Sequence, residues 1–326
     1  MKILITGTAG FIGFHLARRL LAEGHEVLGV DNFNDYYDVR LKEARNAELE
    51  KSNAFRVARV DISEASALRA VFDEFAPEIV VNLAAQAGVR YSITHPEVYM
   101  ASNIAGFLNV LECCRHAERM PNLLYASSSS VYGGLKELPF REDMRVDTPI
   151  SLYAASKKAD ELMAHSYSHL YGLQTIGFRF FSVYGPWGRP DMAAWIFADA
   201  MREGRTIKVF NHGDMYRDFT YVDDIVDGIV RCVNGLDGLP RCDVYNIGNH
   251  RSERLMDMIE IIAHEMGIRS LADVKMEMLP MQDGDIPASF AAIDKLHDAV
   301  GYEPTTPISV GMPKFIAWYR EWNGIR

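Results

Sequence analysis

The sequence predicts an α/β fold: a doubly wound parallel sheet covered by helices on both faces, followed by a smaller mixed α/β lobe. Short apolar segments of strand length alternate, through the first half of the chain, with segments whose apolar residues recur at helical spacing. A glycine-rich turn, "TGTAGFIG" (6–13), joins the first of these strands to the first helix. The alternation ends after about residue 180, so we expect a first domain over 1–180 and a second lobe over 181–326, with some segments returning to the first domain.

Six runs rich in Val, Ile, Leu or Phe have the length of buried strands. We expect strands at 2–6, 25–30, 55–60, 78–84, 122–127 and 175–180. Four segments between or after them show the apolar spacing of helices. We expect helices at 11–24, 63–75, 101–117 and 153–171. The connection over 32–50 is long for such a fold, and we expect a short charged helix within it.

The composition is that of an ordinary soluble protein, with 48% hydrophobic and 24% charged residues in a chain of 326. The net charge of −10 provides no general basic surface, so nucleic acid is not an expected partner. No apolar run approaches the ~18 residues of a membrane span, and the early first strand leaves no room for a signal peptide. The four cysteines lack metal-ligand spacing, so we expect reduced thiols, no metal site and a cytoplasmic protein.

The glycine turn is the first candidate binding element. Gly7 permits a tight turn, Gly10 a close approach to a pyrophosphate, and Gly13 the packing of the helix on the strand. The free N–H groups at the start of that helix then face the phosphates. Asp31 ends the second strand, where a carboxylate can accept both ribose hydroxyls of NAD and repel the extra phosphate of NADP. Asp61 follows the third strand and can accept from the adenine amino group; both aspartates have the alternative of capping a turn or helix.

Tyr153 and Lys157 lie four residues apart on a predicted helix, so they share one face. A free tyrosine ionises only near pH ~10, but a lysine ammonium one turn away and the positive nicotinamide ring of NAD both favour the phenolate. Lowering the ionisation point by ~3 pH units takes roughly 4 kcal/mol, which two desolvated cations can supply. Four serines (127–130) stand at the end of the strand before this helix, and one hydroxyl there can bridge a substrate hydroxyl and Tyr153. The alternative is a solvated helix face beside a polar turn.

Together these motifs resemble the extended short-chain dehydrogenase/reductase family over nearly the whole chain. The resemblance rests on the glycine turn, Asp31, "NLAAQ" (82–86), "SSSSVYG" (127–133) and the Y-x-x-x-K pair. It implies a Rossmann-type sheet and a homodimer that packs the helices 101–117 and 153–171. The implied catalytic set is Ser128, Tyr153 and Lys157, with Ser129 or Ser130 as alternatives to Ser128. The implied NAD contacts come from Gly7, Gly10, Phe11, Ile12, Gly13, Asp31, Asn32, Asp61, Ile62, Leu83, Ala84, Ala85, Gln86, Asn103, Tyr153, Lys157 and Phe180.

The residues before "VYG" bear on the reaction. Related dehydratases carry an Asp-Glu pair there, and related decarboxylases usually carry a glutamate, whereas this chain has Ser129 and Ser130. Elimination of water therefore lacks its acid and base. What remains is epimerisation: Tyr153 takes the proton of the sugar 4-hydroxyl, NAD accepts hydride from C4, the 4-keto sugar turns over, and hydride returns to the opposite face.

Three segments, 31–45, 82–96 and 184–193, look closely like those of UDP-glucuronate 4-epimerases. The resemblance implies conversion of UDP-glucuronate to UDP-galacturonate, and Ser182 stands where UDP-galactose 4-epimerases have asparagine. A 4-epimerase of neutral UDP-sugars is the nearest alternative; a decarboxylase or dehydratase and a cofactor-binding regulator without activity are less favoured. Roles are expected in carboxylate binding (Ser129, Ser130, Ser182, Arg90), phosphate binding (Arg189, Arg217) and nucleotide binding (Val209, Gln282, Asp285).

Overall fold

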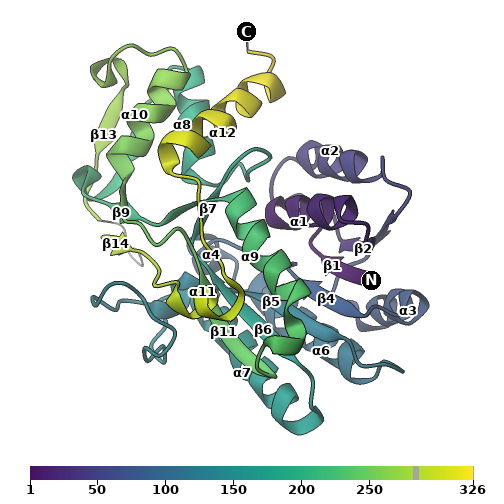
Figure 1. Ribbon diagram of the computed structural model, residues 1–326. Coiled ribbons are helices and arrows are strands. Elements are labelled where there is room, and N and C mark those ends of the chain that lie inside the picture. Colours follow the sequence, from purple (N-terminus) through teal and green to yellow (C-terminus); the bar gives the residue numbers. More distant parts are fainter. Residues whose placement is uncertain (282–285, 326) are drawn as a thin grey trace.

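The computed structural model describes residues 1–281 and 286–325, and a seven-stranded parallel sheet forms its centre (Figure 1). The strand order is β11-β6-β5-β4-β1-β2-β3. From β1 the chain builds outward through β2 and β3 and then, in the other direction, through β4, β5 and β6, which confirms the predicted doubly wound sheet. The strands are β1 (Lys2–Thr6), β2 (Glu26–Asp31), β3 (Phe55–Arg59), β4 (Ile79–Asn82), β5 (Asn122–Ser128), β6 (Thr175–Phe180) and β11 (Cys242–Ile247).

All six predicted strands occur, each within two residues of its expected bounds. The seventh, β11, was not predicted and pairs with β6 at the edge of the sheet. Its first three residues are only partly buried, so the edge strand lacks the continuous apolar run by which the central strands are found.

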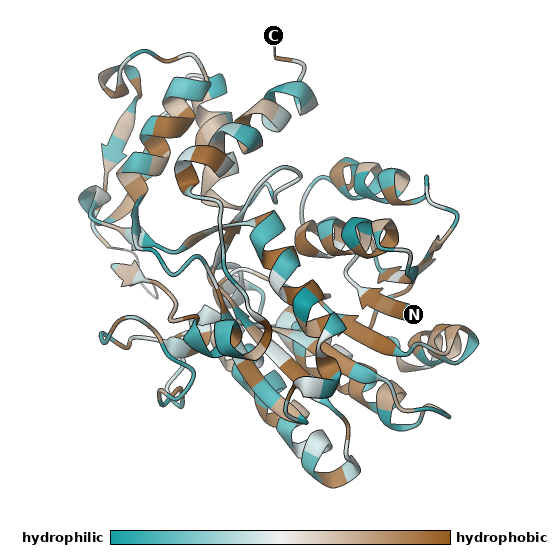
Figure 2. Ribbon diagram, viewed as in Figure 1, coloured by the Kyte–Doolittle hydropathy of each residue, from teal (hydrophilic) through white to brown (hydrophobic). Residues whose placement is uncertain are grey.

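Two layers of helices cover the sheet because side chains alternate along each strand. In β1, Ile3 and Ile5 point to one face and Leu4 to the other. The first face is covered by α1 (Phe11–Ala22), α9 (Val222–Asn234) and α11 (Asp294–Val300). The second face is covered by α3 (Ala65–Phe75), α6 (Gly106–Arg115) and α7 (Leu152–Tyr171). Figure 2 shows the apolar colouring concentrated along the central strands between these layers.

The expected helix at 101–117 differs at its start. Two short helices, α4 (Tyr91–Thr94) and α5 (Pro96–Tyr99), lead into a π-helical turn, η1 (Met100–Ala105), and only then does α6 begin. The short helix expected within 32–50 is confirmed as α2 (Val39–Leu49). No helix in the described ranges is both long and apolar enough to cross a membrane.

A second cluster of elements lies at the upper left of Figure 1, away from the large sheet. Its core contains α8 (Ala193–Arg202), α10 (Leu255–Glu265) and α12 (Ile308–Trp322), and three of the four tryptophans of the chain belong to this core or pack against it. Small sheets flank it: β7 (Ser182–Tyr184) with β10 (Phe219–Tyr221), β8 (Ile207–Val209) with β13 (Met276–Met278), and β9 (Tyr216–Arg217) between β12 (Glu253–Arg254) and β14 (Ala288–Ser289). The single turns are η2 (Ser129–Tyr132), η3 (Phe210–Gly213), η4 (Leu236–Gly238) and η5 (Leu271–Asp273).

Candidate active site

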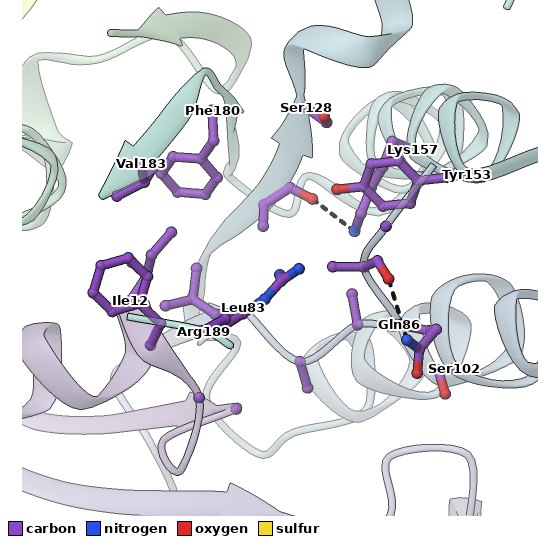
Figure 3. Close-up of a pocket in the computed structure, with 18 of the residues that line it drawn as sticks. Ile12, Leu83, Gln86, Ser102, Ser128, Tyr153, Lys157, Phe180, Val183 and Arg189 are labelled. Atoms are coloured by element: carbon purple, nitrogen blue, oxygen red, sulfur yellow. Dashed lines mark hydrogen bonds between the residues drawn. The ribbon is translucent and has the colours of Figure 1, made fainter. Parts of the chain in front are cut away.

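A large pocket lies where the central strands end. Carboxyl ends of β1, β2, β4, β5 and β6 all reach it, as expected for a ligand site in an open α/β sheet. Residues of the second cluster close its other side, among them Ser182 and Arg217. Figure 3 shows side chains from both parts converging on the cavity. Most of the predicted cofactor residues line it: Gly7, Gly10, Phe11, Ile12, Gly13, Asp31, Asn32, Asp61, Ile62, Leu83, Ala84, Ala85, Gln86, Tyr153, Lys157 and Phe180.

The glycine turn directly follows β1, and its three glycines line the pocket. Gly7 has φ +78°, and its N–H donates to the carbonyl of Val30 at 2.7 Å. A Cβ on Gly13 would lie 2.1 Å from the carbonyl oxygen of Gly7, and one on Gly10 would lie 2.9 Å from the same atom. The turn's own packing therefore requires these two glycines, including Gly10, for which approach to a pyrophosphate was the predicted reason. The first-turn N–H groups of α1 have no acceptor within the helix, and no carboxylate occupies that turn.

Asp31 is held in place at the end of β2. One carboxylate oxygen accepts the N–H of Ala9 at 3.0 Å and the other accepts the N–H of Phe33 at 2.9 Å. Burial raises the pKa of this carboxyl, although those hydrogen bonds oppose the rise. Asp31 lines the pocket, and each oxygen has the capacity to accept one more hydrogen bond, which fits two ribose hydroxyls.

Asp61 lies two residues beyond the end of β3, and its carboxylate is already engaged. It accepts the N–H of Ser63 at 2.8 Å and the side-chain amide of Asn32 at 2.7 Å. Burial acts to raise the pKa of Asp61, but these hydrogen bonds outweigh it and the pKa is lowered. The helix after it is capped at Glu64 instead, so Asp61 is not the N-cap of α3.

Asn103 does not line the pocket, although it was predicted as a cofactor contact. It is 1% exposed, accepts the N–H of Gln86 at 2.8 Å and donates to the carbonyl of Gln86 and to the hydroxyl of Ser156. Asn103 therefore holds in place the pocket wall formed by the segment after β4, without lining the pocket itself. Its neighbour Ser102 does line the pocket, and sequence reasoning missed Ser102 because a π-helical turn has no sequence pattern of its own.

The serine cluster ends β5 and begins η2. All four serines, 127–130, line the pocket. Ser128 accepts hydrogen bonds from the N–H of Ser130 at 3.2 Å and from its hydroxyl at 2.9 Å. Ser127 instead donates to Glu161 at 2.7 Å in the buried layer. Ser129 and Ser130 thus present hydroxyl groups to the cavity, and no acidic side chain stands at these two positions of the sequence.

Tyr153 and Lys157 both face the pocket from α7, whose first turn is capped by the Ser151 hydroxyl (Figure 3). The Lys157 ammonium donates to the carbonyl of Ala126 at 2.9 Å and to Asp160 at 3.1 Å. The Lys157 and Asp160 side chains are only 2% and 1% exposed. Asp160 was not predicted, and burial raises the pKa of its carboxyl to about 7, with Lys157 opposing the rise.

On the substrate side, Ser182, Arg189 and Arg217 line the pocket together with Ser129 and Ser130. Arg189 forms a two-point ion pair with Asp191, at 2.9 and 2.6 Å, and this raises the pKa of the arginine despite its burial.

Other predicted substrate residues lie elsewhere. Arg90 is exposed and its guanidinium stacks 5.2 Å from the ring of Phe210, outside the pocket lining. Val209 is buried in β8 and does not line the pocket either. Gln282 and Asp285 fall outside the described residues. In the described ranges no group of three or more His, Cys, Asp or Glu side chains could hold a metal ion.

Comparisons with known proteins agree with this geometry. The model of the NAD dependent epimerase/dehydratase family matches residues 3–248. The chain is 50% identical to Protein CapI of Staphylococcus aureus, over 99% of each chain, and 44% identical to a probable UDP-glucuronate 4-epimerase of Rhizobium meliloti, over 98% of this chain and 97% of that one. A crystal structure of UDP-glucuronic acid 4-epimerase from Bacillus cereus, in complex with UDP-glucuronic acid and NAD, superposes with a TM-score of 0.90 at 31% identity, covering 99% of this chain and all of that one. The chain therefore belongs to the NAD-dependent epimerase/dehydratase family.

Proposed function

We propose that the protein is a UDP-glucuronate 4-epimerase that interconverts UDP-glucuronate and UDP-galacturonate with NAD as a retained cofactor. The observation that carries the proposal is the composition of one cavity: Ser128, Tyr153 and Lys157 line it, with serines at 129 and 130 where an eliminating enzyme needs acids. The names of the Rhizobium relative and of the Bacillus cereus structure support the same activity.

The residues fit NAD. The first turn of α1 offers N–H groups for the pyrophosphate, Asp31 offers two acceptors for the ribose, and Tyr153 and Lys157 lie on the opposite wall. When bound, NAD supplies a hydride acceptor in the first half-reaction and a hydride donor in the second.

Tyr153 then acts as the base for the 4-hydroxyl, and its phenol returns the proton in the second half-reaction. Lys157 supports the phenolate because its ammonium is fixed by the Ala126 carbonyl and by Asp160. Burial raises the pKa of the Asp160 carboxyl to about 7, and the neighbouring Lys157 ammonium opposes that rise. Ser128 keeps its hydroxyl close to the reacting hydroxyl, steadied by Ser130.

The uronate is recognised by hydroxyl groups. Ser129, Ser130 and Ser182 line the substrate side of the cavity and can donate to a carboxylate without protonating it, each such bond stabilising by about 1.5–3 kcal/mol. The serines thereby avoid supplying the acid that elimination needs. Arg217 and Arg189 add positive charge for the diphosphate.

Product analysis tests the proposal. Purified protein is incubated separately with UDP-glucuronate and UDP-glucose, and products are resolved by anion-exchange chromatography and NMR. UDP-glucuronate should give UDP-galacturonate at equilibrium without net NADH, and Tyr153→Phe should abolish turnover while NAD stays bound. Formation of a pentose nucleotide would replace the proposal with decarboxylation, and equal rates on UDP-glucose would replace it with a neutral-sugar epimerase.

We further propose a cytoplasmic homodimer. The helices α6 and α7 pack against each other and leave Leu108 and Leu162 exposed, at 40% and 58%. A second copy would bury this apolar surface in a four-helix contact. The cytoplasmic location follows from the expected nucleotide-sugar substrate and from unpaired cysteines. We also propose that the chain divides into two domains at residue 180, with β11 and α9 returning to the first domain.

A further inference from the structure

The long connection between β2 and β3 makes two polar attachments to a loop more than 140 residues away. We call residues 32–49 the strap; it begins directly after Asp31 and ends with α2. The distant partner is the 185–192 loop, which follows β7. The catalytic steps above use neither the strap nor these attachments, although strap residues line the pocket.

The first attachment is Arg45, which is 0% exposed. One of its guanidinium nitrogens donates to the carbonyl of Ala9, in the glycine turn, and to the hydroxyl of Tyr37, both at 2.7 Å. The other donates to the carbonyls of Trp187 at 2.5 Å and Gly188 at 3.2 Å. A single side chain of the strap therefore fixes both the phosphate-binding turn and the base of the 185–192 loop.

The second attachment lies beside the pocket. The Tyr36 hydroxyl donates to Asp191 at 3.2 Å, and Asp191 in turn holds Arg189 by two bonds. Tyr36 and Arg189 both line the pocket. The Tyr36 ring is fixed edge-on against Tyr91, with centroids 4.9 Å apart. Burial and the Asp191 charge raise the pKa of Tyr36 to about 12, so the hydroxyl keeps the proton that it donates.

The position of the Tyr36–Asp191 hydrogen bond indicates a function for it. The strap leaves the sheet at Asp31, the ribose acceptor, and the 185–192 loop carries Arg189 into the side of the cavity that faces Tyr153. We propose that NAD leaves between the strap and the 185–192 loop, so that the Tyr36–Asp191 hydrogen bond acts as a clasp that keeps NAD in the pocket between turnovers, with Arg45 joining the two segments at a second, fixed point.

The test measures release of NAD and not turnover, so it succeeds or fails independently of the sugar specificity. Protein purified with NAD is mixed with excess isotopically labelled NAD, and the label on the protein is followed by rapid gel filtration. Tyr36→Phe removes one hydroxyl and leaves the ring packing on Tyr91. We expect roughly tenfold faster exchange, which corresponds to about 1.4 kcal/mol for one hydrogen bond to a charged group.

The chain offers a matched control. Tyr319 donates to Asp199 at 2.5 Å, and Asp199 pairs with Arg202 at 3.2 Å, so the same Tyr–Asp–Arg arrangement occurs outside the pocket lining. Tyr319→Phe should leave the exchange rate unchanged. Equal acceleration by both variants would mean general loosening and would overturn the clasp, as would exchange by Tyr36→Phe at the wild-type rate.

A double substitution separates the clasp from any other effect of the Tyr36 hydroxyl. In an Asp191→Ala background the hydroxyl has no acceptor to lose, so adding Tyr36→Phe should accelerate exchange less than twofold. A full additional tenfold would show that Tyr36 acts through some other contact, and the proposal would be wrong.

Discussion

The Asp218 carboxylate accepts four hydrogen bonds, and replacing it by asparagine should be destabilising. The carboxylate is 0% exposed. One oxygen accepts the N–H of Asn249 at 2.6 Å and the hydroxyl of Thr220 at 2.7 Å. The other accepts the N–H groups of His250 at 3.1 Å and Ala291 at 3.0 Å. Asp218 thus ties the segment that carries Arg217 to the loop after β11 and to the chain after β14.

An amide cannot replace this carboxylate in either orientation. With the NH₂ in place of the oxygen that faces Asn249, the Thr220 hydroxyl can turn and accept, but the Asn249 N–H loses its acceptor and faces another donor; the opposite orientation leaves two N–H groups without an acceptor. The better orientation therefore loses one hydrogen bond to a charged acceptor, and the expected loss in the free energy of unfolding is about 1.5–3 kcal/mol. Burial raises the pKa of Asp218 to about 6, so at pH 8, where the measurement is made, the wild-type side chain is ionised.

Urea denaturation followed by tryptophan fluorescence measures this loss, because three of the four tryptophans belong to the core of the second cluster or pack against it. Asp224→Asn is the comparison: one oxygen of Asp224 accepts only the N–H of Thr306, so its amide also sacrifices a single bond. We expect an effect of similar size there. A loss under ~1 kcal/mol for Asp218→Asn would refute the reasoning.

Two further predictions concern pH and assembly. The His15 ring donates to the Pro186 carbonyl at 2.8 Å, and burial lowers its pKa to about 3. The unfolded value is near 6.5, so the stability that neutral His15 contributes is complete above that pH and is lost as pH falls toward ~3, up to about 5 kcal/mol. His15→Gln keeps a donor but cannot titrate, so its melting temperature should fall less steeply than that of the wild type between pH 6.5 and 4; parallel curves would contradict this. Leu162→Glu should convert the proposed dimer to monomer in sedimentation analysis, whereas exposed Ile93→Glu, in α4, should not, and a wild-type monomer would end that proposal.

The sequence predicted the central sheet well because the sheet is built from local patterns. Each buried strand is a short apolar run, and β1 and β6 were predicted residue for residue. The glycine turn was recognised for the same reason: the positive φ of Gly7 and the packing of Gly13 leave a mark within seven residues. Tyr153 and Lys157 were found because helical spacing is also local.

What the sequence did not reveal depends on contacts between distant segments. Asn103 looked like a cofactor contact, but its bonds to Gln86 and Ser156 place it behind the wall. Arg90 lies four residues after Gln86, yet it stacks on Phe210, more than 100 residues away. Asp160 was overlooked because three residues after a lysine an acid is an ordinary helical neighbour, and only burial of the pair makes it relevant to the chemistry.

The strap shows both a local pattern and contacts between distant segments. Its sequence showed only a long charged connection, while its two attachments, through Arg45 and Tyr36, depend on a loop that the chain forms some 140–155 residues later. An epimerase ends each cycle with its cofactor in the starting redox state, so release of NAD serves no step of the reaction. A dehydrogenase of the same fold must open this wall in every turnover, because its cofactor leaves in the other redox state. A hydrogen bond that retains NAD is therefore compatible with epimerisation and opposed to net oxidation, so the proposed clasp and the proposed reaction are consistent with each other.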